Sequence, residues 1–164
     1  MAKNTKDEKT NVMRTLEQRN IPYTAHTYAH EEGVAVDGVT VAQMLGQDPE
    51  QVFKTLVARG ASRGIYVFVI PVADSLDLKK AAKAVGEKSI EMVAVKEINA
   101  LTGYIRGGCS PVGMKKQYPT VFHETVEIID TIMVSAGKIG AQVELNPQAL
   151  MELVDGTAAD ITVG

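Results

Sequence analysis

The segment from Gly103 to Lys116 holds the residues whose types and spacing best suit chemistry. It contains four glycines, one proline and three cations, and little that a core would bury. Glycine-rich backbone can present N–H groups to an oxygen-rich anion, and cations add positive potential. A magnesium-dependent phosphate loop would need Gly-Lys-Ser/Thr, whereas Met114 and Lys115 follow Gly113. The segment therefore indicates either an anion-binding loop outside the ATPase class or a surface turn with incidental lysines.

Two further side chains are candidates for chemistry. Lys54 lies in the apolar run 52–58, where it would either extend its ammonium group to solvent or direct it into a polar cleft. Cys109 is a candidate nucleophile, because Arg106 is three residues away and would lower the pKa of the thiol. His123 would then be the base. Simple packing of a small thiol is the alternative.

The histidines His26 and His30 raise the question of a metal site. They are four residues apart and would suit a metal ion if they lay on a helix. The alternating pattern from 21 to 30 and Pro22 predict a strand instead, and no third ligand follows locally. The motifs HExxH, paired CxxC and Gly-x-Gly-x-x-Gly are absent from the sequence. We therefore expect no metal and no other cofactor.

Length and composition bound the class of protein. With 164 residues, 45% of them hydrophobic, the chain suits one compact domain over residues 1–164. No apolar run approaches the roughly 18 residues of a membrane span, and the polar start lacks the apolar core of a signal peptide. The single cysteine excludes an internal disulfide and fits a reducing compartment. These features predict a cytoplasmic protein without a membrane partner.

Charge is distributed unevenly along the chain. The net charge is −3, yet eight cations and three acids fall between Lys79 and Lys116, so that stretch carries +5 and the remainder −8. A basic region of this kind attracts a phosphate backbone even on an acidic protein. A solvated helix face with scattered lysines is the alternative interpretation.

Hydrophobic periodicity indicates the elements that must position these residues. The pattern predicts helices over residues 6–19, 39–45, 76–85 and 147–154. It predicts strands over residues 21–30, 52–58, 65–70, 90–93, 120–123, 132–135 and 141–145. Because strands and helices do not alternate regularly, we expect an α+β fold with a mixed, mostly antiparallel sheet rather than a doubly wound one.

Five segments taken together resemble the YbaK/EbsC proteins, which are free-standing relatives of the editing domain of bacterial prolyl-tRNA synthetase. They occur in order along most of the chain, at residues 26–30, 52–56, 76–80, 103–113 and 135–140. The resemblance implies a barrel-like mixed sheet flanked by helices and a trans-editing aminoacyl-tRNA deacylase. It implies hydrolysis of Cys-tRNA(Pro), with Cys-tRNA(Cys) accepted by some members. The implied partners are the 3′ end of aminoacyl-tRNA and prolyl-tRNA synthetase.

The same resemblance implies roles for individual residues. Lys54 matches the functional lysine, and Gly107 matches the loop glycine whose backbone approaches the ester. Gln142 stands where cysteine-specific members carry an aspartate, so it can hydrogen-bond a substrate amine but offers no charge. The amino-acid preference therefore stays open, with Ala-tRNA(Pro) as an alternative substrate. The residues expected to bind substrate are Tyr28, Thr55, Arg106, Gly108, Ser135, Gly137 and Gln142.

Ester chemistry accounts for the lack of a recognisable triad. An aminoacyl ester is already activated, so orientation and oxyanion stabilisation are the main requirements. In the cysteine case the resemblance implies that the substrate's own thiol attacks its carbonyl to give a cyclic thioester. The alternative from another class is a non-catalytic module that binds a tRNA 3′ end or a nucleotide.

Overall fold

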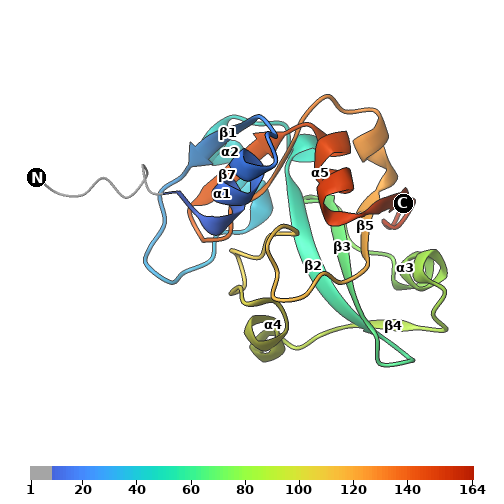
Figure 1. Ribbon diagram of the computed structural model, residues 1–164. Helices are drawn as coiled ribbons and strands as arrows, with labels where there is room; N and C mark the ends of the chain where they lie inside the picture. The colour runs from blue at the N-terminus through green and yellow to red at the C-terminus, as the bar shows by residue number, and fades with distance from the viewer. Residues whose placement is uncertain (1–8) are drawn as a thin grey trace, which may run out of the picture.

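The computed structural model describes residues 9–164 as two β-sheets with helices packed around them (Figure 1). The helices are α1 (Asn11–Gln18), α2 (Gly38–Leu45), α3 (Leu78–Val85), α4 (Val95–Thr102) and α5 (Pro147–Val154), with 3₁₀ turns η2 (Pro49–Gln51) and η3 (Glu124–Glu127). The strands are β1 (Tyr23–Thr27), β2 (Phe53–Gly60), β3 (Ile65–Pro71), β4 (Ile90–Met92), β5 (Thr120–His123), β6 (Ile132–Ser135), β7 (Ala141–Leu145) and β8 (Thr157–Ala159). None of the helices in this described part is long and apolar enough to cross a bilayer.

The strands form two sheets rather than one closed barrel. The smaller sheet has the order β1-β7-β6 and is antiparallel throughout. The larger has the order β4-β2-β3-β5-β8, in which β5 is parallel to both of its neighbours. An isolated backbone bridge from Val52 to Met133 brings the start of β2 beside β6. The expected α+β fold with a mixed, mostly antiparallel sheet is confirmed, and the strands form two sheets that meet at this bridge, where β2 goes on to pair with β3 and β4.

Helix ends explain why several predicted boundaries agree with the structure. The side chains of Asp37, Asp77 and Asn146 accept backbone N–H bonds at the starts of α2, α3 and α5. Gly46 and Gly86 end α2 and α3 in the left-handed region, with φ of 66° and 74°. Such caps are local features of the sequence, and they confirm these three helices to within two residues. The helix expected over 6–19 is α1, but it begins only at Asn11, because the side chain of Thr10 caps it by accepting the Met13 N–H; residues 6–8 lie outside the described part.

One helix and one strand escape the sequence pattern. The N-cap of α4 is Ala94, whose side chain accepts nothing; the carboxylate of Glu97 accepts the Ala94 N–H instead, at 3.3 Å. The strand β8 has three residues and pairs in parallel with β5. Neither a helix without a polar cap nor a three-residue strand leaves a clear periodic signal.

The core packs α1 and α5 against the sheets and fixes the start of β2. The ring of Phe53 is 2% exposed and belongs to the same buried cluster as Leu16 of α1 and Leu150 of α5. Burial of such a side chain is worth about 1.5–3 kcal/mol. Because Phe53 is anchored, the next two residues, Lys54 and Thr55, are held where the two sheets meet.

Candidate functional site

A cleft of about 620 Å³ opens between the two sheets. Its walls come from the start of β2, the facing ends of β6 and β7, the segment leading into α2, and the loop after α4. Gly108 and Gly137 do not line it. The expected site residues that do are Tyr28, Lys54, Thr55, Arg106, Gly107, Ser135 and Gln142.

Lys54 is half-buried in this cleft. Within residues 9–164 its ammonium group forms neither a hydrogen bond nor an ion pair at contact distance. Burial lowers the pKa of Lys54, and the charge of Asp74 partly opposes that shift. Of the two expectations for Lys54, the structure therefore favours the polar cleft. A partly desolvated cation without a partner is unfavourable for the fold and available to an anionic ligand.

Two buried polar atoms of the cleft also lack partners. Thr55 Oγ1 and Gln142 Oε1 make no hydrogen bond to any residue that the structure describes. Gln142 is only 7% exposed and lies in register with His26 on β1 and Ser135 on β6. About nine in ten buried polar groups in proteins are hydrogen-bonded, and leaving one unpaired costs about 1–3 kcal/mol. The residues that carry these two atoms line the cleft, so hydrogen-bonding capacity that the protein leaves unused lies in the cleft wall.

Gly107 brings the loop after α4 into close contact with the segment before α2. Its φ is 88°, and a Cβ at this position would lie 2.6 Å from the Cβ of Ala35. Both the backbone conformation and the space therefore require glycine. The result is that the cleft wall at this point is backbone rather than side chain.

The other two expected glycines have supporting positions. A Cβ on Gly108 would lie 3.0 Å from the Cα of Lys138, so Gly108 allows two backbone segments to pack together. Gly137 has a φ of 100°, and its N–H donates to Ser135 Oγ at 3.1 Å. Gly137 thus orients the Ser135 hydroxyl from outside the cleft, while Ser135 itself lines it.

The structure does not support Cys109 as a nucleophile. Cys109 lines the cleft, but burial raises the pKa of its thiol to about 11, opposite to the lowering expected from Arg106. His123, the expected base, accepts the Ile161 N–H at Nδ1 and lies 3.3 Å from Thr162 Oγ1 at Nε2. Cys109 therefore contributes a small, neutral wall to the cleft.

The histidines near Tyr28 have separate partners. The Tyr28 ring meets the His30 ring edge to face, with centroids 6.2 Å apart, and the Tyr28 N–H donates to Gly140 O at 3.0 Å. The His30 ring covers Gly140, where a Cβ would lie 2.4 Å from Nε2. His26 Nε2 instead lies 2.9 Å from a carboxylate oxygen of Glu144. Tyr28 is thus held at the cleft by the backbone and by one imidazole.

Asp37 is a cleft residue that the sequence analysis did not single out. Its carboxylate accepts the N–H and the hydroxyl of Thr40 at the start of α2, and these bonds lower the pKa of Asp37. The pattern Asp37-Gly38 before an apolar run signals a helix N-cap. That signal reveals the helix start, but it gives no indication that the residue faces a cleft.

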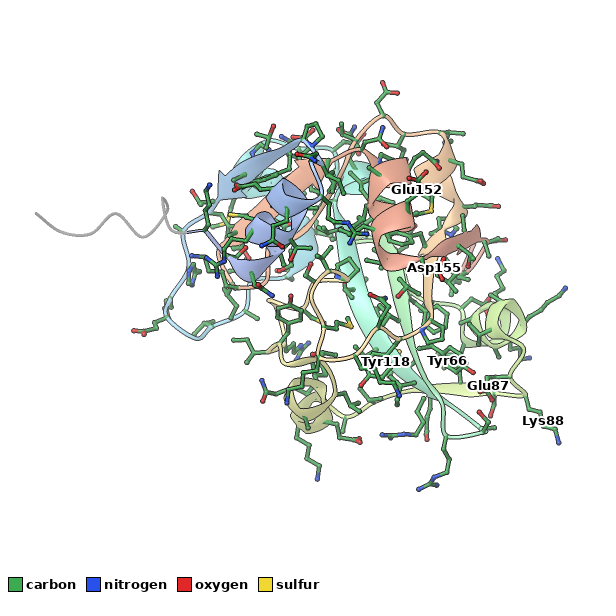
Figure 2. All side chains as sticks on the ribbon, viewed as in Figure 1. Tyr66, Glu87, Lys88, Tyr118, Glu152 and Asp155 are labelled. Carbon is green, nitrogen blue, oxygen red and sulfur yellow. The ribbon has the colours of Figure 1, made fainter. Side chains whose placement is uncertain are left out.

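The pentapeptide Gly60–Gly64 has the spacing Gly-x-Ser-x-Gly of a hydrolase nucleophile motif. Here it forms the hairpin turn between β2 and β3, whereas a nucleophile elbow joins a strand to a helix. Ser62 Oγ donates to the Glu87 carboxylate. The same carboxylate accepts from Tyr66 OH at 2.6 Å, and Figure 2 labels these last two residues. Ser62 therefore stabilises a turn and is not a site residue.

Fold and cleft together define a class of protein. The family profile described as "Aminoacyl-tRNA editing domain" matches residues 33–153, and the chain belongs to this family. A relative from Enterococcus faecalis, named "Putative Cys-tRNA(Pro)/Cys-tRNA(Cys) deacylase EbsC", is 48% identical over 162 residues. That match covers 99% of this chain and 98% of the relative. The resemblance drawn from five short segments is thereby confirmed.

Solved structures agree with the assignment. One described as a "putative trans-editing enzyme for prolyl tRNA synthetase" is 25% identical, with a TM-score of 0.78, and covers 96% of this chain and 100% of that one. Another, described as a hypothetical protein, has a TM-score of 0.82 at 22% identity, over 93% of this chain and 99% of that one. The second likeness shows the fold alone.

Proposed function

We propose that this protein is a trans-editing deacylase that hydrolyses the ester of mischarged aminoacyl-tRNA. Its substrate is Cys-tRNA(Pro), with Cys-tRNA(Cys) as a second substrate and prolyl-tRNA synthetase as a partner. The observation that carries the proposal is the cleft, where an unpaired lysine, two unpartnered buried polar atoms and a glycine backbone meet. The name of the 48% identical relative supports the substrate class.

In this proposal the polar groups of the cleft orient the ester and stabilise the charge that develops on it. Lys54 provides positive potential for the terminal ribose and phosphate, and the backbone at Gly107 faces the ester carbonyl. Preorganised donors and charges of this kind are commonly the largest contribution to catalysis of acyl transfer. Thr55 Oγ1 and Gln142 Oε1 bond the substrate in place of the partners that they lack within the protein.

For a cysteinyl ester the nucleophile comes from the substrate. The sulfur attacks the carbonyl carbon, the bond from that carbon to the ribose oxygen breaks, and the thiol proton ends on the ribose hydroxyl. The products are free tRNA and a cyclic thioester, which water opens to cysteine. An unperturbed cysteine thiol has a pKa of about 8.5, so a nearby cation increases its thiolate fraction at neutral pH. This route requires no nucleophile from the protein, in keeping with the raised pKa of Cys109.

The decisive experiment is a deacylation panel with purified protein. Cys-tRNA(Pro), Cys-tRNA(Cys), Ala-tRNA(Pro) and Pro-tRNA(Pro) are incubated separately, each with and without prolyl-tRNA synthetase. We expect hydrolysis of the two cysteinyl esters. Ser-tRNA(Pro), which carries a hydroxyl in place of the thiol, is the matched control and should be resistant if the substrate thiol is the nucleophile. If no ester is cleaved under any condition, the deacylase assignment is wrong, and the non-catalytic binding module takes its place.

Gln142 gives the panel its second purpose. A neutral amide accepts a hydrogen bond from an amine but supplies no charge, so discrimination between amino acids must come from the shape of the cleft and from the thiol route. Faster cleavage of Ala-tRNA(Pro) than of Cys-tRNA(Pro) would support the deacylase activity and show that the substrate is the alanyl ester.

A further inference from the structure

The lysine-rich stretch that looks like one basic region in the sequence separates in the structure into two groups, while Lys88 after α3 and Lys96 on α4 belong to neither. The first, the loop group, consists of Arg106, Lys115 and Lys116 on the loop after α4. The second, the α3 group, lies on helix α3. Figure 1 shows α3 and α4 at opposite ends of β4, so the two groups occupy different parts of the surface. The α3 group consists of Lys79, Lys80 and Lys83.

The loop group is exposed, and acids do not compensate it locally. All three side chains are exposed, and none forms an ion pair with another described residue. No Asp or Glu occurs anywhere between Ile98 and His123. Within the loop itself no acid opposes the positive potential, and Asp37 is the one acid among the residues that line the cleft with Arg106.

The loop group also continues from the cleft. Arg106 lines the cleft itself. The Lys115 stem runs along the helix end, with its Cγ 3.2 Å from where a Cβ of Gly103 would be. The Lys116 ammonium lies 6.0 Å from the centre of the Tyr118 ring, which holds a hydrogen bond from its hydroxyl to Leu101 O. The cations are thus distributed along one loop that begins at the cleft wall.

The α3 group has neighbours of the opposite charge. Lys80 Nζ donates to Asp160 at 3.0 Å and to Thr162 O at 2.9 Å. Asp77 caps the start of the helix, and Glu87 follows its C-terminal glycine. No α3 residue lines the cleft. One of the three lysines of this helix is therefore paired with an acid, and none of them lines the cleft.

We infer that the loop group is the surface that holds the phosphates of the tRNA strand next to the aminoacylated end, and that the α3 group has no part in RNA binding. The inference rests on the proposed function, because the cleft is taken to hold the terminal ester. A strand leaving the cleft meets Arg106 first, and a guanidinium suits bidentate contact with a phosphate. Lys115 and Lys116 then supply point charges farther along the same loop.

The test uses the full chain and uncharged tRNA(Pro), so that binding is measured apart from hydrolysis. The variant is Lys115→Gln with Lys116→Gln, and the matched control is Lys79→Gln with Lys83→Gln, which removes the same charge from α3. Fluorescence anisotropy is recorded over a salt series. We expect the loop variant to bind about tenfold more weakly at low salt, with the slope of log K against log salt reduced by about 1.5. The α3 control should stay within about twofold of the unmodified protein.

Equal losses in the two variants, or a larger loss in the α3 control, would overturn the assignment of the surface. A third result would also overturn it: the loop variant binds tRNA normally, but added prolyl-tRNA synthetase changes the anisotropy with the unmodified protein and not with the variant. In that case the loop contacts an acidic protein surface, and the RNA assignment is wrong. If only the deacylase proposal is wrong, the result differs from all of these. The unmodified protein then cleaves no ester, yet its tRNA binding still depends on Lys115 and Lys116.

Discussion

The cleft and the region around His123 both bury polar side chains, but they treat them in opposite ways. Around His123 the imidazole has partners within the chain: its ring meets the Ile161 N–H and the Thr162 hydroxyl, and nearby Lys80 meets Asp160. Thr125 Oγ1 on η3 is the exception, a buried oxygen without a partner among the described residues. In the cleft, Lys54 and the buried oxygens described above have none. Paired polar groups stabilise a fold, whereas unpaired ones reduce stability and are available to a ligand.

Residue type is therefore a weaker guide to function than a hydrogen-bonding group that has no partner within the protein. His123, Glu124 and Asp160 bring ligand-type atoms within 4.8 Å of one another, the kind of cluster that suggests a metal. Yet His123 already contacts Ile161 and Thr162, and Asp160 accepts from Lys80, and these bonds hold the segment that follows β8. By type alone, Thr55 and Gln142 look ordinary.

The largest expected effect separates activity from stability at Lys54. We expect Lys54→Met to reduce kcat/KM for Cys-tRNA(Pro) by about 10²–10³-fold, because the removal of one preorganised group that stabilises developing charge has an effect of that size. The pKa of Lys54 is lowered in the fold, so the unfolded chain holds the proton more tightly, and the burial cost is fully present below the folded pKa. Lys54→Met should therefore raise the melting temperature at pH 7.

The control for Lys54→Met is the pH dependence of the expected rise in melting temperature. As pH rises through the folded pKa towards the ordinary lysine value of 10.5, the unmodified protein loses the proton and the difference between the two proteins should shrink. Thermal unfolding at pH 7 and pH 10 measures it. A Lys54→Met protein that is less stable at pH 7 would show that the lysine supports the fold, and the comparison with His123 would lose its basis.

The second expected effect is at His123, where a substitution should reduce stability and leave activity unchanged. His123→Leu leaves the Ile161 N–H and the Thr162 hydroxyl without their partner, and we expect the free energy of unfolding to fall by about 1–3 kcal/mol. At temperatures well below the transition kcat/KM should be unchanged, because His123 does not line the cleft. Urea denaturation and the deacylation assay measure the two quantities. Loss of activity in a protein that remains folded would return His123 to the list of functional residues.

The smallest expected effect concerns Gln142. Gln142→Leu removes a buried acceptor that has no partner, so the free energy of unfolding should stay the same or rise by about 1 kcal/mol. The same change should raise KM for Cys-tRNA(Pro) and leave kcat less affected, as expected for a group that binds the substrate in its ground state. Gln142→Asn, which keeps an amide on a shorter stem, is the control. A destabilised Gln142→Leu protein with normal KM would show that the amide belongs to the fold.

Local signals account for the elements that the sequence predicts well. The strands over 120–123, 132–135 and 141–145 and the helix over 147–154 have the expected bounds, because alternation and capping are written in neighbouring residues. The hairpin of β2 and β3 follows from two apolar runs around a turn. Resemblance to a family, rather than periodicity, supplied the candidate site, since Lys54 and Ser135 belong to distant segments.

What the sequence could not give depends on long-range packing. The raised pKa of Cys109 comes from burial, which no neighbouring residue reveals. Whether Gly108 and Gly137 face the cleft or lie behind it depends on how Lys138 and Ser135 pack against them. The sequence likewise does not show that the loop group and the α3 group are separated. That becomes visible only in the structure, where α3 and α4 lie at opposite ends of β4 and the loop group follows α4.

The contact between Gly107 and Ala35 also sets a rule for how this chain can change over generations. The two positions share room for a single methyl group, and at present it belongs to residue 35. That methyl group cannot be exchanged, because a φ of 88° penalises any side chain at position 107 even when residue 35 is glycine. Substitutions at this part of the cleft are therefore possible in one direction only. Ala35 can be replaced by glycine, whereas no change at position 35 makes a side chain acceptable at position 107.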